Sequence, residues 1–473
     1  MTGVSPSSSF SFHAPSYFCS YWYHSPYQVP RQQIHNNAWT FSTSKKKFHH
    51  AQCKHRHRLL LPCNNFTPAL ASWHRLLRVG RSQLRRSIRS CCFSGPQREV
   101  YGRQHYALPF QPHLLQTLNL AYNSFNQLSA VLLFGFGKKL ANLTHLNLSY
   151  SGLLVGQVPI SISRLTKLIS LDLSTYDIYP LKLEKPDLGT LIGDLSHLKE
   201  LYLDEVDISS STTEWSQAIS HSVPGLEALS LIDCSLSGPI DSSFSKLQNL
   251  SILHLDSNSL SQVPEFFAKF PSLSVLSLSG CGLEEFFPTR VFEELLNLKT
   301  LDLSYNPMLA RVSLGSLLNS LLKLKSLTSL KLAGCNFSEP IPRSIWNLSE
   351  LVNLNLADNH LFGDLPPMPA SSKISILDLS YNNVTGLISS TLSSARQLVS
   401  LDLAGNSLIG SIPMSLFTLP QLEKLYLADN KLSGQLQEFK NASSTLQYVD
   451  LSGNNLRGKL PKITSQSLCS RVT

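Results

Sequence analysis

The strongest constraint on the fold is a Leu-x-Leu pattern that recurs fourteen times at spacings of 23 to 30 residues. This alternation is typical of a short strand with both leucines on one side. A unit of this length cannot bury its own leucines, so neighbouring units must stack and bury them together. The pattern begins at Leu118, Leu146, Leu171, Leu201, Leu229, Leu253, Leu276, Leu301, Leu330, Leu354, Leu377, Leu401 and Leu425, and Val449 takes the last place.

The residue five places after most of these leucines is Asn or Cys, which completes the leucine-rich-repeat pattern. We expect each of them to be buried where the chain leaves the strand, with its polar group bonded to the backbone of the turn. Ser151, Tyr176 and Val206 interrupt the series, so we expect the least regular geometry there. The predicted ladder consists of Asn123, Cys234, Asn258, Cys281, Asn306, Cys335, Asn359, Asn382, Asn406, Asn430 and Asn454.

These patterns predict an α/β fold, namely a right-handed leucine-rich-repeat solenoid of horseshoe or superhelix shape. About 14 repeats would occupy residues 113–473, with parallel strands on the concave face. Several turns continue as Gly-x-Ile-Pro, for example at Gly410–Pro413. Glycine permits the bend and proline ends the pairing, and this form resembles the plant subclass of the repeat.

Charge divides the chain near residue 112. Residues 1–112 carry 15 Lys and Arg against one acid, Glu99, whereas residues 113–473 carry 25 against 30 Asp and Glu. The nine cysteines are scattered and odd in number, so they predict neither a disulfide framework nor a metal site. We find no run of 18 apolar residues and no secretory signal, so this chain as written is expected to lack a transmembrane segment, an anchor and a signal peptide.

Two stretches are more specific than the repeat. Residues 214–258 read EWSQAISHSVPGLEALSLIDCSLSGPIDSSFSKLQNLSILHLDSN, and residues 264–306 read PEFFAKFPSLSVLSLSGCGLEEFFPTRVFEELLNLKTLDLSYN. Both resemble plant leucine-rich-repeat receptor-like proteins of the Verticillium-wilt-resistance type, over about residues 113–473. The resemblance implies a secreted ectodomain, one membrane-spanning helix, a short cytoplasmic tail, and signalling through a partner receptor kinase. Ser216 departs from the family, in which Cys usually follows Trp215, and the C-terminal cap, helix and tail are expected to be missing here.

The family also has an N-terminal cap of the form W…DCC.W.GV.CD, which is absent as written. Residues 70–99 read LASWHRLLRVGRSQLRRSIRSCCFSGPQRE. Permitted codons for this stretch can be translated in another frame, one that starts one nucleotide late inside the codon of Trp73. They then allow GTDCCVWEGVNCDEASGHVVFLDLSE, which is the missing cap. We interpret residues from about 73 to 112 as an out-of-frame translation, which makes the basic charge an artefact. The whole segment 1–112 is expected to be disordered.

The predicted function is ligand recognition, in plant defence or cell-surface signalling, by an ectodomain that binds a protein or peptide on its concave face. Consensus aspartates of the strands are expected to be structural. No phosphate-binding glycine loop, GxSxG, HExxH or kinase motif is present, so neither enzymatic activity nor a cofactor is predicted. The candidate contact residues are Glu200, Tyr202, Asp204, His254, Asp256, Lys331, Lys424 and Tyr426.

Two alternatives stay open: a non-functional gene fragment, and a nucleic-acid-binding protein that uses the basic first 112 residues. The out-of-frame interpretation removes the premise of the second, so no nucleic-acid partner is expected. Sequons favour the extracellular face of the plasma membrane, which the family resemblance also implies. The predicted glycosylation sites are Asn142, Asn249, Asn336, Asn347, Asn383 and Asn441, whereas Asn147 is expected to be poorly reached on the strand face.

Overall fold

The computed structural model describes residues 114–123, 139–151, 156–176, 181–211, 214–283, 288–436, 443 and 445–459. Every described residue belongs to the unit Leu60–Thr473. The predictions made for residues 1–112 and for Asn441 therefore lie outside the described residues.

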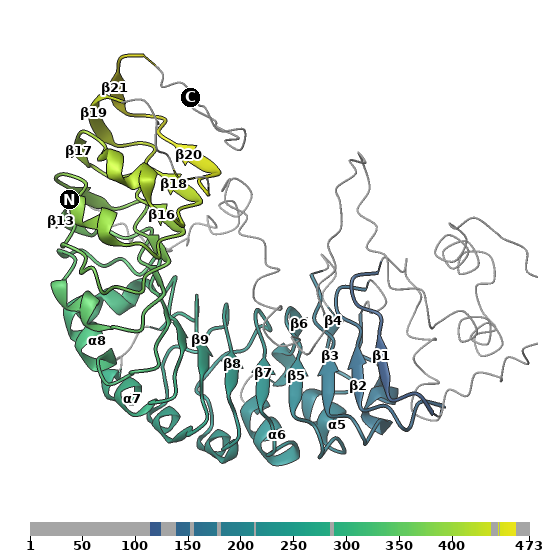
Figure 1. The fold of residues 1–473 in the computed structure, drawn as a ribbon. Helices are drawn as coiled ribbons and strands as arrows, with labels where there is room; N and C mark the ends of the chain where they lie inside the picture. Colours follow the sequence, from purple (N-terminus) through teal and green to yellow (C-terminus); the bar gives the residue numbers. More distant parts are fainter. Residues whose placement is uncertain are drawn as a thin grey trace, which may run out of the picture. The chain divides into compact units, whose positions relative to one another are not determined.

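The fourteen predicted strands form one parallel sheet, which confirms the solenoid (Figure 1). Each strand has three residues with the repeat leucine, or Val449, at its centre, and Leu118 pairs with Leu146, which pairs with Leu171. The strands in sheet order are β1 (Thr117–Asn119), β2 (His145–Asn147), β3 (Ser170–Asp172), β5 (Glu200–Tyr202), β7 (Ala228–Ser230), β8 (Ile252–His254), β9 (Val275–Ser277), β10 (Thr300–Asp302), β11 (Ser329–Lys331), β12 (Asn353–Asn355), β14 (Ile376–Asp378), β16 (Ser400–Asp402), β18 (Lys424–Tyr426) and β20 (Tyr448–Asp450).

Short helical segments return the chain from one strand to the next, and within the described array they lie on the side away from the large sheet (Figure 1). Several begin at a polar cap, as where the Asp187 side chain accepts the backbone N–H of Thr190. The α-helices are α5 (Leu188–Ile192), α6 (Trp215–Ser222), α7 (Thr289–Glu294) and α8 (Leu314–Leu321). The 3-10 helices are η5 (Ile160–Arg164), η6 (Ser209–Ser211), η7 (Ser242–Lys246), η8 (Glu265–Lys269), η9 (Pro307–Arg311), η10 (Arg343–Asn347), η11 (Ser390–Ser394) and η12 (Met414–Thr418).

The space between the sheet and the helical segments is filled by one continuous hydrophobic core. The central leucines of neighbouring strands, such as Leu301 and Leu330, are both fully buried there. Burial of apolar side chains against the next repeat is the main stabilising contribution available to such an array.

Small parallel sheets form where the chain leaves the large sheet. Their strands are β4 (Leu181–Lys182) with β6 (Val206–Asp207), β13 (Phe362–Asp364) with β15 (Asn383–Thr385), and β17 (Ile409–Gly410), β19 (Lys431–Gln435) and β21 (Asn455–Arg457). The β4–β6 pair, α5 and α6 occupy the region in which the ladder was expected to be interrupted, and Val206 is fully buried within β6.

Candidate binding face

Asn258 illustrates how the ladder residues join consecutive repeats. Its side-chain Nδ2 donates to three backbone carbonyls, one of them that of Leu231 in the preceding repeat at 2.7 Å. Its Oδ1 accepts the backbone N–H groups of Cys234 and Leu236. Nδ2 likewise donates to three carbonyls, one from the preceding repeat, at Asn306, Asn359, Asn382, Asn406, Asn430 and Asn454. Asn123 donates to two carbonyls of its own repeat.

The ladder cysteines reach the preceding repeat with their thiols. The Sγ atoms of Cys234, Cys281 and Cys335 donate to backbone carbonyls at 3.0, 3.1 and 3.2 Å, and all three cysteines are free and buried. Burial raises the pKa of the Cys234 thiol, and it raises those of Cys281 and Cys335 to about 12. Thiols held neutral in this way are poor nucleophiles and poor metal ligands.

The residues between the paired leucines form a single row across the large sheet, one from each strand, which we call the central row. In register order it consists of Asn119, Asn147, Asp172, Tyr202, Ser230, His254, Ser277, Asp302, Lys331, Asn355, Asp378, Asp402, Tyr426 and Asp450. Polar and aromatic side chains thus lie on the strand face that is opposite to the leucine core.

Each aspartate and asparagine of the central row also has a local role. The side chain of Asp302, for example, accepts the backbone N–H of Ser304, two residues further along. The same bond is made by Asn119, Asn147, Asp172, Asn355, Asp378, Asp402 and Asp450. These bonds hold the turn that follows the strand, which is a structural reason for the residue type.

The C-terminal part of the central row is acidic and aromatic. Asp378 and Asp402 lie side by side in register, and Tyr426 and Asp450 continue the row. Burial raises the pKa of Asp402, and the neighbouring carboxylates of Asp378 and Asp450 raise it further, whereas the hydrogen bond from the Ala404 backbone N–H lowers it. The resulting pKa is about 7. Burial also raises the pKa of Asp378. A cation placed here would favour the ionised form of both carboxyls.

The structure corrects the prediction that Asp204 is an exposed contact residue. Asp204 is only 5% exposed, and its carboxylate accepts the Ser230 hydroxyl at 2.5 Å and the backbone N–H of Ile232. Asp256 has the same bonds, to the Ser277 hydroxyl at 2.5 Å and to a backbone N–H at 2.7 Å, with 14% of its side chain exposed. Both carboxylates therefore join neighbouring strands.

The other candidate contact residues lie on the strand face but do not form one cluster. Glu200 and Tyr202 are half-buried in β5, and His254 in β8 has its Nδ1 atom 3.8 Å from the Asp256 carboxylate. Lys331 pairs with Asp302 at 3.1 Å on the adjacent strand. Lys424 is exposed in β18, and Tyr426 packs against Tyr448 with ring centroids 4.8 Å apart.

The predicted glycosylation sites differ in accessibility. Asn249, Asn336, Asn347 and Asn383 are exposed. Asn142 is half-buried, and its Oδ1 accepts the Lys167 ammonium at 2.6 Å. Asn147 lies in the central row, as expected.

A tyrosine stack was missed in the sequence. Tyr122, Tyr150 and Tyr176 stack with ring centroids 5.1 and 5.2 Å apart, and Tyr122 and Tyr176 are 58% and 66% exposed. Tyr305 and Tyr381 occupy the same turn position in later repeats as Tyr122 and Tyr150, with a positive φ. The signal was available, because four of these tyrosines stand four residues after a repeat leucine.

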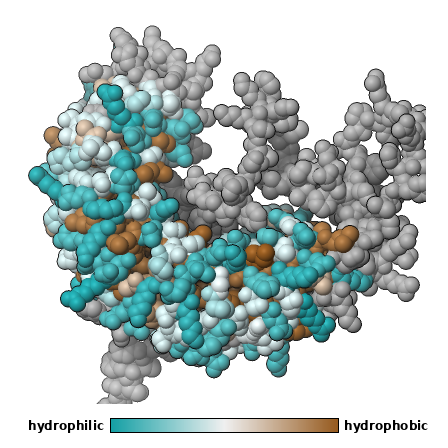
Figure 2. Space-filling model, turned by 60° about the horizontal axis from the view of Figure 1, so that its bottom comes forward, coloured by the Kyte–Doolittle hydropathy of each residue, from teal (hydrophilic) through white to brown (hydrophobic). Residues whose placement is uncertain are grey.

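The face turned forward in Figure 2 is largely hydrophilic, with apolar patches among the polar side chains. No helix among the described residues is long and apolar enough to cross a membrane. Within the same residues, no three His, Cys, Asp or Glu side chains are grouped so that they could hold a metal ion.

Comparisons with known proteins agree with the fold. Residues 224–283 and 372–432 match a family model described as leucine rich repeat, and residues 326–348 and 445–466 match a second such model. The chain is 32% identical to receptor-like protein 7 of Arabidopsis thaliana over 48% of this chain and 22% of that protein. It is 33% identical to receptor-like protein 6 of the same plant, over 52% of this chain and 19% of that protein.

The chain thus spans about a fifth of the length of these curated relatives. Its fold is similar to the crystal structure of a TDR receptor, with a TM-score of 0.53 and 25% identity over 76% of this chain and 63% of that one.

Proposed function

The chain belongs to the plant leucine-rich-repeat receptor-like proteins, and from this premise we propose that its strand face binds a protein or peptide ligand. The observation that carries the proposal is the central row, which places fourteen side chains in register on one face of the sheet, all but Ser230 and Ser277 at least partly exposed, and leaves the leucine core intact. A rigid, preorganised surface loses little conformational entropy when a ligand binds. The protein would act by recognition and not by catalysis.

The cellular setting is part of the same proposal. Similarity to receptor-like proteins supports an extracellular position at the plasma membrane, a role in defence or cell-surface signalling, and a receptor kinase as the signalling partner. The acidic and aromatic part of the row, from Asp378 to Asp450, favours a ligand segment that carries Arg or Lys, because carboxylates and tyrosine rings both attract cations.

Selection of peptides from a random 12-residue phage library on the full chain tests this proposal. We expect the selected peptides to bind at least about tenfold more weakly to one or more of the variants Tyr202→Ala, Asp402→Asn and Tyr426→Ala, a loss of about 1.4 kcal/mol. Lys323→Ala, which removes an exposed lysine that pairs with Glu293 between helical segments, is the control and should leave binding unchanged. Peptides that bind all three face variants as well as the original chain would contradict the proposal.

A further inference from the structure

The turns that follow the strands of the large sheet have a common charge. We call them the exit turns, and each consists of the three residues that stand three to five places after a repeat leucine, from residues 121–123 to residues 452–454. Because all fourteen strands are parallel, the exit turns follow one another along a single edge of the sheet. They contain six Asp or Glu and no Lys, Arg or His. This edge therefore attracts cations.

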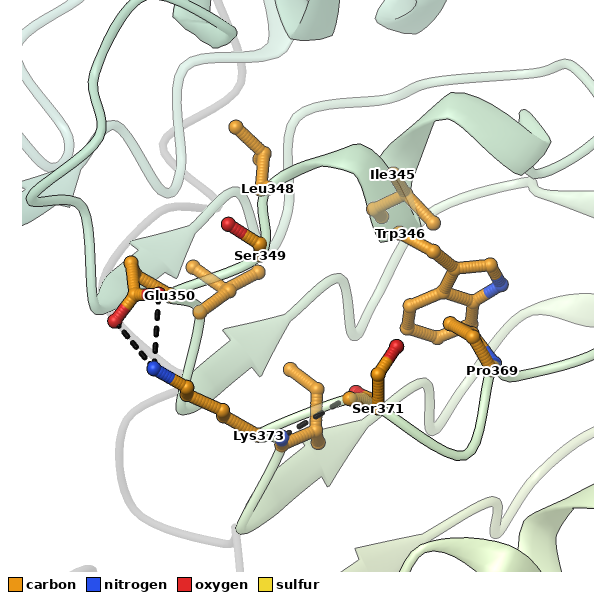
Figure 3. A pocket seen from close by; sticks show the side chains of 11 residues that line it. Ile345, Trp346, Leu348, Ser349, Glu350, Pro369, Ser371 and Lys373 are labelled. Carbon is orange, nitrogen blue, oxygen red and sulfur yellow. Dashed lines mark hydrogen bonds and ion pairs between the residues drawn. The ribbon is translucent and has the colours of Figure 1, made fainter.

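The opposite edge of the sheet has the reverse charge. Among the described residues that stand two to seven places before a repeat leucine, eleven are Lys or Arg and five are Asp or Glu. The hollow beside η10 has no net charge, because Glu350 and Lys373, its two charged side chains, pair with each other at N–O distances of 2.7 and 2.8 Å (Figure 3). The excess of acids therefore belongs to the ends of the strands and not to the surface in general.

The first three exit turns carry the tyrosine stack. The Tyr150 ring lies between those of Tyr122 and Tyr176, so each outer ring has one face covered by Tyr150. Both outer side chains remain more than half exposed. Since the rings follow the order of the repeats, the outer face of Tyr176 is turned toward the fourth repeat. The stack therefore ends in an accessible aromatic face.

Carboxylates take the place of rings in the next two exit turns. Glu205 and Asp233 stand four residues after their repeat leucines, as Tyr150 does, and they have the same positive φ, 61° and 53° against 50°. Glu205 is half-buried and Asp233 is exposed. Burial raises the pKa of the Tyr150 hydroxyl, and nearby carboxylates, those of Asp204 and Glu205 among them, raise it further. The acids are thus close enough to make the surroundings of the stack negative.

We propose that the first five exit turns bind an arginine-bearing segment of another protein, with one guanidinium on the outer face of Tyr176. Charge complementarity makes this segment basic. Arginine suits it better than lysine, because a planar guanidinium packs flat on a tyrosine ring and still offers paired N–H donors to carboxylates such as Glu205 and Asp233.

The length of the site follows from the spacing of the strands. The four steps between five neighbouring turns span about 20 Å, at about 5 Å a step, and an extended segment of about six residues covers this distance. The site lies outside the central row, so it is independent of the ligand proposed for that row.

Fluorescence anisotropy on the full chain tests the proposal. The labelled probe is a 12-residue peptide in which Arg alternates with Ser, and two further probes carry Lys or Glu in place of Arg. We expect the Lys probe to bind about threefold more weakly than the Arg probe, and the Glu probe not to bind. Tyr176→Ala should weaken binding of the Arg probe by about two- to fivefold. Tyr176→Phe keeps the ring face and should retain the affinity.

Tyr305→Ala is the matched control, because Tyr305 is 55% exposed in an exit turn but lies outside the stack. It should leave the affinity for the Arg probe unchanged. The loss in Tyr176→Ala should persist in a chain that also carries Asp402→Asn and Tyr426→Ala, because those changes remove the cation contacts proposed for the C-terminal part of the central row. The two proposals can therefore fail separately.

Equal affinity of Tyr176→Ala and the original chain for the Arg probe would overturn the proposal, and so would equal binding of the Arg and Glu probes. If Tyr176→Ala does not fold, Asp233→Asn gives the same test at an exposed carboxylate, with an expected loss of about twofold. Sedimentation of the chain alone tests the other source of cations, the base-rich edge of a second copy. Self-association that is lost in Tyr176→Phe and Asp233→Asn, without any binding of the Arg probe, would show that the occupant is a second copy and that the proposal is wrong.

Discussion

At the scale of single residues, the ladder asparagines hold the repeats together through polar bonds in an otherwise apolar interior. Asn406 is 8% exposed; its Nδ2 donates to the carbonyls of Leu379, Leu403 and Ala404, and its Oδ1 accepts the backbone N–H of Val384. An amide suits this place because it supplies donors and an acceptor on one short side chain. A carboxylate of the same size has no donor to offer.

Replacement of Asn406 by Asp should therefore lower the free energy of unfolding by about 1–3 kcal/mol, because three buried carbonyls lose their donor. Urea unfolding at pH 7 measures the change. Asn455→Asp, one residue after a ladder asparagine but exposed in β21, is the matched control and should have little effect. Equal stability of Asn406→Asp and the original chain would show that the ladder bonds contribute nothing.

Replacement of Asp402 should raise the free energy of unfolding, whereas replacement of Asn406 should lower it. Because its pKa in the folded chain is raised to about 7 from the usual value of 3.8, the unfolded chain loses this proton at lower pH than the folded chain does. The carboxyl therefore costs stability progressively as pH rises from about 4 to about 7. Asp402→Asn, which keeps an acceptor for Ala404, should raise the free energy of unfolding at pH 8 by about 1–2 kcal/mol and leave it unchanged at pH 3.

Denaturation of Asp402→Asn at the two pH values checks this expectation. Asp194→Asn, at an exposed position, serves as the comparison and should shift neither curve. A gain of the same size at pH 3 and at pH 8 would mean that protonation of Asp402 is not the cause.

The leucine spacing was sufficient to predict every strand of the large sheet, because a repeat leucine has only one way to reach the common core. Side chains outside that core were harder to place. Asp204 resembles an exposed strand residue in the sequence, and only the position of Ser230 on the next strand shows why it is buried. The Tyr122–Tyr150–Tyr176 stack depends on how far apart successive turns lie, which spacing along the chain does not specify.

At the scale of the element, the turns after most strands of the large sheet share one backbone conformation. The residue four places after the repeat leucine has a positive φ in most repeats, for example 57° at Tyr305 and 64° at Gly405. A tyrosine there covers the corresponding glycine of the next repeat, as Tyr305 covers Gly334 and Tyr381 covers Gly405. Such pairs couple the turns of neighbouring repeats outside the core.

Gly405→Ala should destabilise the chain for two reasons. Its φ of +64° is unfavourable for alanine, and the added Cβ would lie 2.7 Å from the Tyr381 ring. We expect a loss of about 1–3 kcal/mol. Tyr381→Ala should restore part of it in the double variant, by relieving the contact but not the backbone strain. Thermal denaturation of the two single variants and the double variant measures both parts.

Gly225→Ala is the control for that series, because an added Cβ there has no heavy atom within 4 Å. A double variant no more stable than the sum of its parts would argue against the tyrosine contact.

At the scale of the whole array, each strand pairs only with the strands beside it. Stability in such an array is approximately a sum over repeats and over contacts between neighbours. A local defect should therefore have local consequences, unlike a defect in the single core of a compact domain.

Leu330→Ala tests this expectation at the centre of β11, where the side chain is fully buried. We expect a cost of about 2–5 kcal/mol, with faster amide exchange in β10, β11 and β12 and unchanged exchange in β2 and β20. Val352→Ala, at a side chain that is 37% exposed, should alter none of these. Uniform acceleration along the array would show that it opens as one cooperative unit.

The leucines stay in register although successive pairs stand 23 to 30 residues apart. Two kinds of genetic change can therefore act on the array separately. Exchange of whole repeats during recombination can lengthen or shorten the array without shifting any surviving strand pair. Point mutation of a single codon in the central row can alter one surface side chain while its neighbours keep their positions. A lineage of such genes can therefore vary the extent of its recognition surface and the chemistry of that surface independently.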